Sequence, residues 1–280
     1  MPKERVLDLN IAYEIIGDGD RTAVITGGGR YSKDAPGIRD LAENLAAGGL
    51  KVLIWDRPNC GESDVCFIGD NEWTLNADVL AGLLRKLDLA PAFVIGGSAG
   101  SRISLLTAKR HPDVVRKLAI LWVSGGALMV GTHIQLYCSN AAFAAFNHGM
   151  EAVLEEGWFK ECVARNPDNR DRILSQDVAS FVATMDRWAE ALIPQEGSPV
   201  PGLVPDDFRA MKVRTLVFNS LHLDVNHRRC WTEMIADLMP NARLEELPFD
   251  ERAWADRHNR GGTFSSWGEL APPLLAFERE

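Results

Sequence analysis

The heptapeptide Val94-Ile95-Gly96-Gly97-Ser98-Ala99-Gly100 joins an apolar run that predicts a strand to a periodic run that predicts a helix. A G-x-S-x-G pattern at such a junction is typical of a sharp turn that pushes the serine hydroxyl outward. Gly96 and Gly100 carry no Cβ, so the strained turn forms without clashes. The alternative is an ordinary serine in a glycine-rich turn. Because the flanking strand and helix supply the required context, we predict that Ser98 is a nucleophile.

Short β-rich runs alternate with helical patterns along most of the chain. The predicted strands are 12–16, 22–26, 51–55, 92–96, 117–123, 215–219 and 243–247. Between them, residues 38–45, 75–87 and 103–111 place apolar side chains at helical intervals. This alternation predicts the α/β class, with a mostly parallel central sheet flanked by helices.

The alternation stops after Gly126 and resumes near Met211. We therefore expect a core formed by residues 1–126 and 206–280, and an inserted helical lid formed by residues 127–205. Aromatic and methionine side chains of this segment could line an apolar substrate pocket, or could equally pack lid helices together. The pocket candidates in the lid are Tyr137, Phe146, Trp158, Met185 and Trp188.

Composition narrows the classes of partner. The chain has 280 residues and a formal net charge of -9, which disfavours binding to nucleic acid phosphates. Its apolar runs are too short to span a bilayer, and Met1 is not followed by a signal-like apolar core, so we expect a cytoplasmic protein without membrane contact. The five cysteines are scattered without C-x-x-C spacing, which suggests reduced thiols and no metal site.

A glycine run, Gly27-Gly28-Gly29-Arg30, follows the predicted strand 22–26. Acyl transfer needs two backbone N–H donors for the oxyanion, one after the nucleophile and one from the loop after an earlier strand. Ala99 and Gly28 fit these two positions, and we expect Gly29 and Arg30 beside the pocket. A phosphate-binding loop is the alternative, but neither G-x-G-x-x-G nor a P-loop Lys-Ser/Thr pair is present.

The segment Asp56-Arg57-Pro58-Asn59-Cys60-Gly61-Glu62-Ser63 resembles the D-x-P-G-x-G-x-S stretch of the α/β-hydrolase superfamily. Asn59 replaces a glycine, and asparagine adopts positive φ more readily than most residues. The resemblance covers most of the chain outside the expected lid. Thr26 is a departure, because superfamily members often have histidine before the first glycine of the oxyanion loop.

The resemblance implies the order serine, acid, histidine, with the acid after the strand that follows the lid. Asp224 occupies that position, although a loop aspartate could instead cap the next helix. The implied base is His258, after the last strand. His227, or no histidine at all, remains an alternative. His222, Asp224 and His227 match no familiar zinc spacing.

These residues predict that His258, oriented by Asp224, deprotonates Ser98, which attacks a carbonyl group whose oxyanion is held by Gly28 and Ala99. We expect a small, largely apolar ester or lactone as substrate and no cofactor. A homodimer is left open. The alternatives are carbon–carbon bond hydrolysis or cofactor-independent oxygenation on the same fold, and a ligand-binding receptor with vestigial hydrolysis.

Overall fold

A central sheet of eight strands runs through the protein, which the computed structural model describes at residues 1–257, 259 and 261–280. In spatial order the strands are β1 (Lys3–Val6), β2 (Leu9–Ile16), β4 (Leu50–Trp55), β3 (Arg21–Thr26), β5 (Ala92–Gly97), β6 (Val115–Leu121), β7 (Thr215–Phe218) and β8 (Ala242–Glu245). β2 pairs antiparallel with β1 and β4, and the other neighbours pair parallel. The predicted α/β class and mostly parallel sheet are confirmed.

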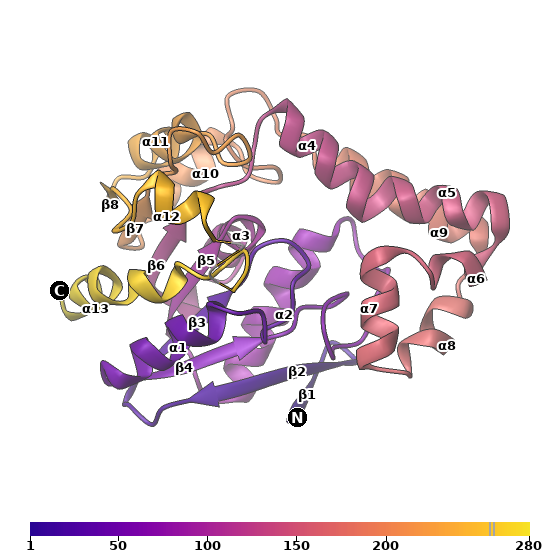
Figure 1. Ribbon diagram of the computed structural model, residues 1–280, viewed down its shortest axis with the longest axis horizontal. Coiled ribbons are helices and arrows are strands. Elements are labelled where there is room, and N and C mark those ends of the chain that lie inside the picture. The colour runs from indigo at the N-terminus through magenta and orange to yellow at the C-terminus, as the bar shows by residue number, and fades with distance from the viewer. Residues whose placement is uncertain (258, 260) are drawn as a thin grey trace.

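Helices cover both faces of the sheet, which explains why most residues of its central strands are apolar and buried. On one face lie α1 (Ile38–Ala47), the short helix η3 (Trp267–Leu270) and α13 (Ala271–Arg279). On the other lie α2 (Glu72–Lys86), α3 (Ala99–Arg110) and α11 (Arg229–Leu238) (Figure 1). Every residue of β5 is buried, so Ser98 follows a strand held on both faces.

The helix α2 begins three residues before the predicted 75–87 segment because of its cap. The side chain of Asn71 accepts a hydrogen bond from the backbone N–H of Thr74 at 2.8 Å. Such a cap satisfies one of the free N–H groups of the first helical turn. Glu72 and Trp73 are thereby placed in the first turn of α2, where both side chains are buried.

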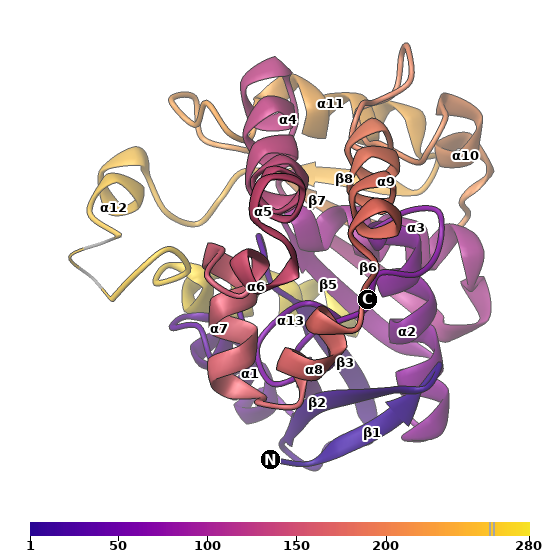
Figure 2. The ribbon, with the colours of Figure 1, turned by 90° about the vertical axis from the view of Figure 1, so that its right-hand side faces the viewer.

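The chain between β6 and β7 is helical. Its elements are α4 (Ala127–Ile134), a π-helical turn η2 (Gln135–Ser139), α5 (Asn140–His148), α6 (Met150–Val153), α7 (Gly157–Arg165), α8 (Asn169–Leu174), α9 (Val178–Glu190) and α10 (Pro205–Ala210). Figures 1 and 2 show α5 and α9 side by side, projecting from the sheet domain. Residues of α4 and η2 reach the cavity at Ser98. The interpretation of residues 127–205 as a lid remains a prediction.

Two short elements complete the chain. The turn η1 (Pro112–Val114) precedes β6, and α12 (Glu251–Ala255) follows β8. In Figure 2, α12 lies at the edge of the molecule. Within the described residues, no helix combines the length and apolar character needed to cross a bilayer.

Candidate active site

Ser98 sits in a strained turn between β5 and α3. Its backbone has φ 56° and ψ -116°, a conformation that costs energy for a residue with a side chain. A Cβ on Gly96 would lie 2.3 Å from the carbonyl oxygen of Gly100, and one on Gly100 would lie 2.1 Å from that of Thr26. The two glycines of G-x-S-x-G are therefore required by close backbone contacts, as the sequence suggested.

A continuous hydrogen-bond chain joins Ser98, His227 and Asp224. Nε2 of His227 lies 2.8 Å from Oγ of Ser98. Nδ1 of the same ring lies 2.7 Å from Oδ2 of Asp224. A serine, an imidazole and a carboxylate in this order are the arrangement that general-base activation of a hydroxyl requires.

Asp224 also shapes the loop that carries His227. Its Oδ1 accepts hydrogen bonds from the backbone N–H groups of Asn226 at 2.9 Å and His227 at 3.2 Å. Burial raises the pKa of Asp224, but the hydrogen bonds from His227 and Asn226 outweigh this effect and the pKa falls below its ordinary value. The carboxylate is therefore ionised at neutral pH, and one side chain both organises the loop and orients the imidazole.

The predicted base, His258, lies outside the described residues. The alternative base, His227, is the histidine that the structure brings to Ser98. His227 follows Asp224 by only three residues. The tight turn around Asp224 folds the backbone back and lets one ring bridge acid and serine.

The predicted oxyanion loop lies directly over Ser98. A Cβ on Gly28 would lie 3.1 Å from Cβ of Ser98. The guanidinium of Arg57 donates hydrogen bonds to the carbonyl oxygens of Gly28 and Gly29, which fixes the direction of these peptides. Ala99 is the first residue of α3, where N–H groups lack intrahelical partners and the helix dipole favours negative charge.

Thr26 precedes the first glycine of the predicted oxyanion loop, and its hydroxyl has a structural partner. Nε1 of Trp55 donates a hydrogen bond to Oγ1 of Thr26 at 3.0 Å, and both residues are buried. This bond ties the end of β3 to the end of β4. It holds the start of the oxyanion loop without a histidine.

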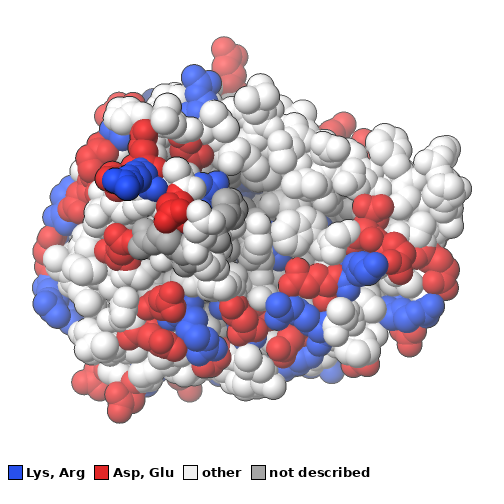
Figure 3. All heavy atoms as spheres, in the orientation of Figure 1, with Lys and Arg blue, Asp and Glu red and all other residues white. Residues whose placement is uncertain are grey.

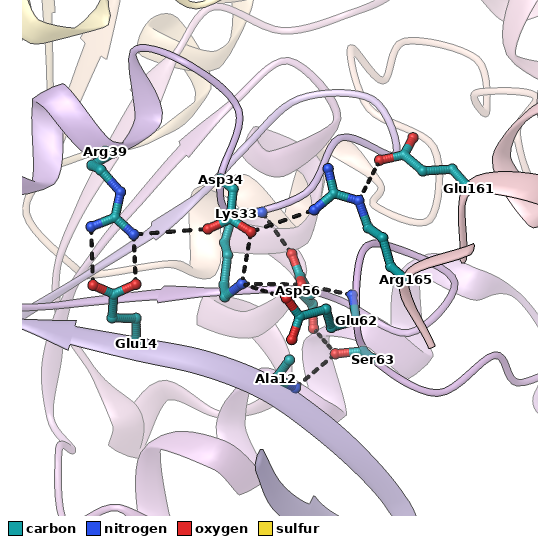
Figure 4. A network of polar contacts seen from close by, with 10 residues as sticks. All are labelled: Ala12, Glu14, Lys33, Asp34, Arg39, Asp56, Glu62, Ser63, Glu161 and Arg165. Atoms are coloured by element: carbon teal, nitrogen blue, oxygen red, sulfur yellow. Dashed lines mark hydrogen bonds and ion pairs between the residues drawn. The ribbon is translucent and has the colours of Figure 1, made fainter. Parts of the chain in front are cut away.

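Asp56 is the centre of a buried network of polar contacts with Lys33, Glu62 and their neighbours, which we call the Asp56 brace (Figure 4). The carboxylate of Asp56 accepts hydrogen bonds from the backbone N–H groups of Lys33 at 2.6 Å and Glu62 at 2.9 Å. The fully buried ammonium of Lys33 lies 3.6 Å from Asp56 and 3.0 Å from Asp34. Burial raises the pKa of Asp56, although the charge of Lys33 opposes that shift. Gly61 is needed because a Cβ there would lie 2.3 Å from the Asp56 carboxyl group.

A cavity of about 200 Å³ opens at Ser98. Its lining contains Gly28, Gly29, Tyr31, Ser98, Trp122, Met129, His133, Leu136, Tyr137, Trp158, Asn226, His227, Trp254, Thr263 and Phe264. Among the described lining residues, none is lysine, arginine, aspartate or glutamate. Figure 3 shows a hollow near the centre of this face, and the surface toward α4 and α5 is largely uncharged. The cavity therefore fits a small ligand with aromatic or apolar character.

The structure places some of the predicted pocket residues at the cavity beside Ser98 and the others elsewhere. Gly29, Tyr137 and Trp158 line the cavity at Ser98. Four others lie elsewhere. Arg30 is buried against Glu72, Trp188 packs against Phe67, and Phe146 and Met185 border a separate groove between α5 and α9.

Sequence reasoning missed Tyr31, Trp122, Trp254 and Phe264 in the cavity lining. Most of these residues belong to loops after β3, β6 and β8, at the carboxyl ends of parallel strands, where ligands bind in open α/β sheets. Large aromatic residues in those loops were the available signal.

Comparison with known proteins gives the family. Residues 24–202 match the family model described as alpha/beta hydrolase fold, which is more than half of the chain. The chain belongs to the alpha/beta hydrolase fold family. Among solved structures, this family member resembles the enol-lactonase from Burkholderia xenovorans LB400, with a TM-score of 0.63, 18% identity and coverage of 100% of both chains.

A second similar structure is a meta-cleavage product hydrolase from Pseudomonas fluorescens IP01, with a TM-score of 0.61, 14% identity and coverage of 100% and 97% of the two chains. In sequence, the chain is 33% identical over 116 residues to 2-hydroxy-6-oxononadienedioate/2-hydroxy-6-oxononatrienedioate hydrolase 1 from Pseudomonas putida. That match spans 41% of each chain. The similar region thus covers about two fifths of the length of this curated relative.

Proposed function

We propose that this alpha/beta hydrolase fold protein cleaves a small, largely apolar carboxylic ester or lactone through an acyl-enzyme on Ser98. The observation that carries the proposal is the unbroken hydrogen-bond chain from Ser98 through His227 to Asp224, at the wall of an aromatic cavity. His227, and not His258, is the proposed base. The acid and the nucleophile remain Asp224 and Ser98.

The geometry supports the following steps. Nε2 of His227 takes the hydroxyl proton of Ser98 as Oγ attacks the substrate carbonyl carbon. The tetrahedral oxyanion is stabilised by the N–H groups of Gly28 and Ala99. The imidazolium, held by Asp224, returns the proton to the departing alkoxide oxygen. A water molecule, deprotonated by the same imidazole, then attacks the acyl carbon and releases the acid and Ser98.

The cavity limits the size of the substrate. An enclosed apolar cavity of about 150 Å³ holds one benzene molecule. The cavity of about 200 Å³ at Ser98 therefore has room for one ring or a short chain, together with the reacting carbonyl group. The aromatic side chains of Tyr31, Trp122 and Trp158 favour a flat or apolar acyl group over a sugar or a nucleotide.

Carbon–carbon bond hydrolysis is the second candidate, because the partial relative from Pseudomonas putida is named as a hydrolase of 2-hydroxy-6-oxononadienedioate. In that reaction, water would be added across a bond beside a ketone, and the same base could serve. Product analysis separates the two candidates. An ester or lactone gives an acid and a hydroxyl group, whereas a vinylogous diketone gives an acid and a carbon product with a new C–H bond.

The decisive test is labelling with a fluorophosphonate probe followed by peptide mapping. We expect the label on the peptide that contains Ser98, no label in Ser98→Ala, and loss of ester turnover on the order of 10⁶-fold in that variant. Ser101 is the matched control for labelling, because it is a neighbouring serine whose hydroxyl is buried and donates to the carbonyl oxygens of Gly96 and Trp122. Label on another residue, or turnover that survives Ser98→Ala, would refute the nucleophile assignment. Ligand binding without labelling or turnover would favour the receptor alternative.

A further inference from the structure

Arg102 is a buried cation one helical turn after the nucleophile. It lies on α3, and only 1% of its surface is exposed. Its guanidinium carbon lies 4.6 Å from the ring centroid of Trp73. Within the described part of the chain, its Nε and Nη1 atoms are buried and have no hydrogen-bond partner. A buried, unsatisfied guanidinium is costly, so its persistence calls for a function or a ligand.

Among the described residues, Arg102 also has no carboxylate that pairs with it alone. Burial lowers its pKa to about 10, and Tyr137 and Glu72 offset this only in part. Glu72 is already engaged, because it pairs with Arg30 at 3.0 Å and accepts a hydrogen bond from Asn59 at 3.0 Å. In Arg30 the same carboxylate outweighs burial and the pKa is raised. Of these two buried arginines, Arg30 has a counter-ion and Arg102 does not.

The side chains near Arg102 form one wall of the cavity at Ser98. The ring of Trp73 lies 5.9 Å from that of Tyr137, and Tyr137 stacks on His133 at 5.0 Å. Tyr137 and His133 both line the cavity. Neither side chain makes a hydrogen bond to another described residue through its polar atoms. The Tyr137 hydroxyl and a ring N–H of His133 are therefore available as donors to a ligand.

Tyr137 and His133 are both neutral, so Arg102 is the charged group behind this wall. Burial raises the pKa of Tyr137 to about 12, so its hydroxyl keeps the proton that it can donate. Burial, followed by the charges of Arg102 and His227, lowers the pKa of His133 to about 3. His133 is then neutral, and its positive neighbour Arg102 supplies the charge that a bound anion would neutralise.

We propose that Arg102 makes this wall anion-accepting, so that the preferred substrate carries a carboxylate at the end of its acyl chain remote from the scissile carbonyl. The inference rests on the proposed function, because both place the acyl group in the cavity at Ser98. The hydroxyl of Tyr137 and the ring of His133 would contact the carboxylate. Arg102 acts through them, as a specificity-determining residue. A neutral substrate would leave its charge uncompensated.

Ligand binding to the Ser98→Ala protein tests the inference without requiring turnover. The probes are monomethyl glutarate and its neutral amide analogue, methyl glutaramate, which have nearly the same shape and differ in charge. Calorimetry gives Kd for each probe in Ser98→Ala alone and combined with Arg102→Met, Arg102→Lys or Arg110→Met. Arg110 is the matched control, since it lies on the same helix but pairs with Asp78 at the surface.

We expect the anionic probe to bind more tightly than the amide. Arg102→Met should remove a preference of about tenfold, the size expected for the attraction between two charges that are not in contact in a partly buried site, whereas Arg102→Lys should retain most of it and Arg110→Met should not change it. The inference is overturned if the anionic probe binds no better than the amide, or if the preference for the anion survives Arg102→Met. It is also overturned if Arg102→Lys abolishes this preference as fully as Arg102→Met does. Failure of fluorophosphonate labelling at Ser98 would instead refute the proposed function, and this calorimetric result would be unaffected.

Discussion

Asp224 and His227 stand three residues apart, and a hydrogen bond of 2.7 Å joins Oδ2 of the first to Nδ1 of the second. The proposed acid and base thus share one loop after β7, and the segment after β8 is not needed to supply the base. His227→Ala should lower kcat by at least about 10³-fold, because Ser98 loses its proton acceptor. His258→Ala should have a milder effect. A dead His258→Ala beside an active His227→Ala would reverse the assignment.

Asp224→Asn separates the two functions of this side chain. The asparagine oxygen can still accept from the backbone N–H groups of Asn226 and His227, so the loop should keep its shape. Its NH₂ group, however, would donate to Nδ1 of His227 and place the ring proton on Nε2, facing Ser98. We expect an unchanged melting temperature and a loss of kcat on the order of 10⁴-fold. Equal activity of Asp224→Asn and wild type would exclude Asp224 as the orienting acid.

His133 makes stability depend on pH. Its pKa is lowered from 6.5 to about 3 by burial first and by Arg102 and His227 next. Below pH 6.5 the unfolded chain therefore binds a proton that the folded protein does not, and the free energy of unfolding falls as pH drops toward 3. Urea unfolding at several pH values should show a shallower decline in His133→Phe, which keeps a ring to stack on Tyr137. An identical slope in both proteins would contradict the buried, neutral state of His133.

At Gly61, unlike at Gly69, a side chain would collide with a neighbouring residue. Both have positive φ, at 54° and 85°, so alanine costs about 1–2 kcal/mol of backbone strain at either position. A Cβ at Gly61 would also meet the carboxyl group of Asp56 at 2.3 Å, whereas Gly69 has open space within 4 Å. Gly61→Ala should therefore be less stable than Gly69→Ala by a further 1–3 kcal/mol or so. Equal melting temperatures would show that the Asp56 brace tolerates displacement.

Most of the sheet could be predicted from local sequence. The seven predicted strands correspond to β2 through β8. β3 through β7 are the clearest of them, because buried parallel strands are largely apolar and are bounded by turn residues. β1 was missed, since Lys3–Val6 is a short edge strand with charged residues and partial exposure.

The site was less predictable than the sheet. Gly96, Ser98 and Gly100 are set by one local turn, so a motif was enough to find them. The partner of Ser98 depends on how the loop 224–227 turns back on itself, which is decided by hydrogen bonds of Asp224 and not by spacing. That Arg102 has no counter-ion of its own among the described residues likewise cannot be predicted from the sequence. It depends on the pairing of Glu72 with Arg30 in the folded protein.

A short acid–base loop has a consequence for engineering. Because Asp224-Val225-Asn226-His227 contains both partners and the hydrogen bonds that hold them, the pair is encoded by four consecutive residues. Such a cassette could be grafted after the corresponding strand of another protein of this fold whose own histidine has been deleted. The segment between β8 and η3 is then free to vary in length, and new substrate-recognition loops could be built there without disturbing proton transfer.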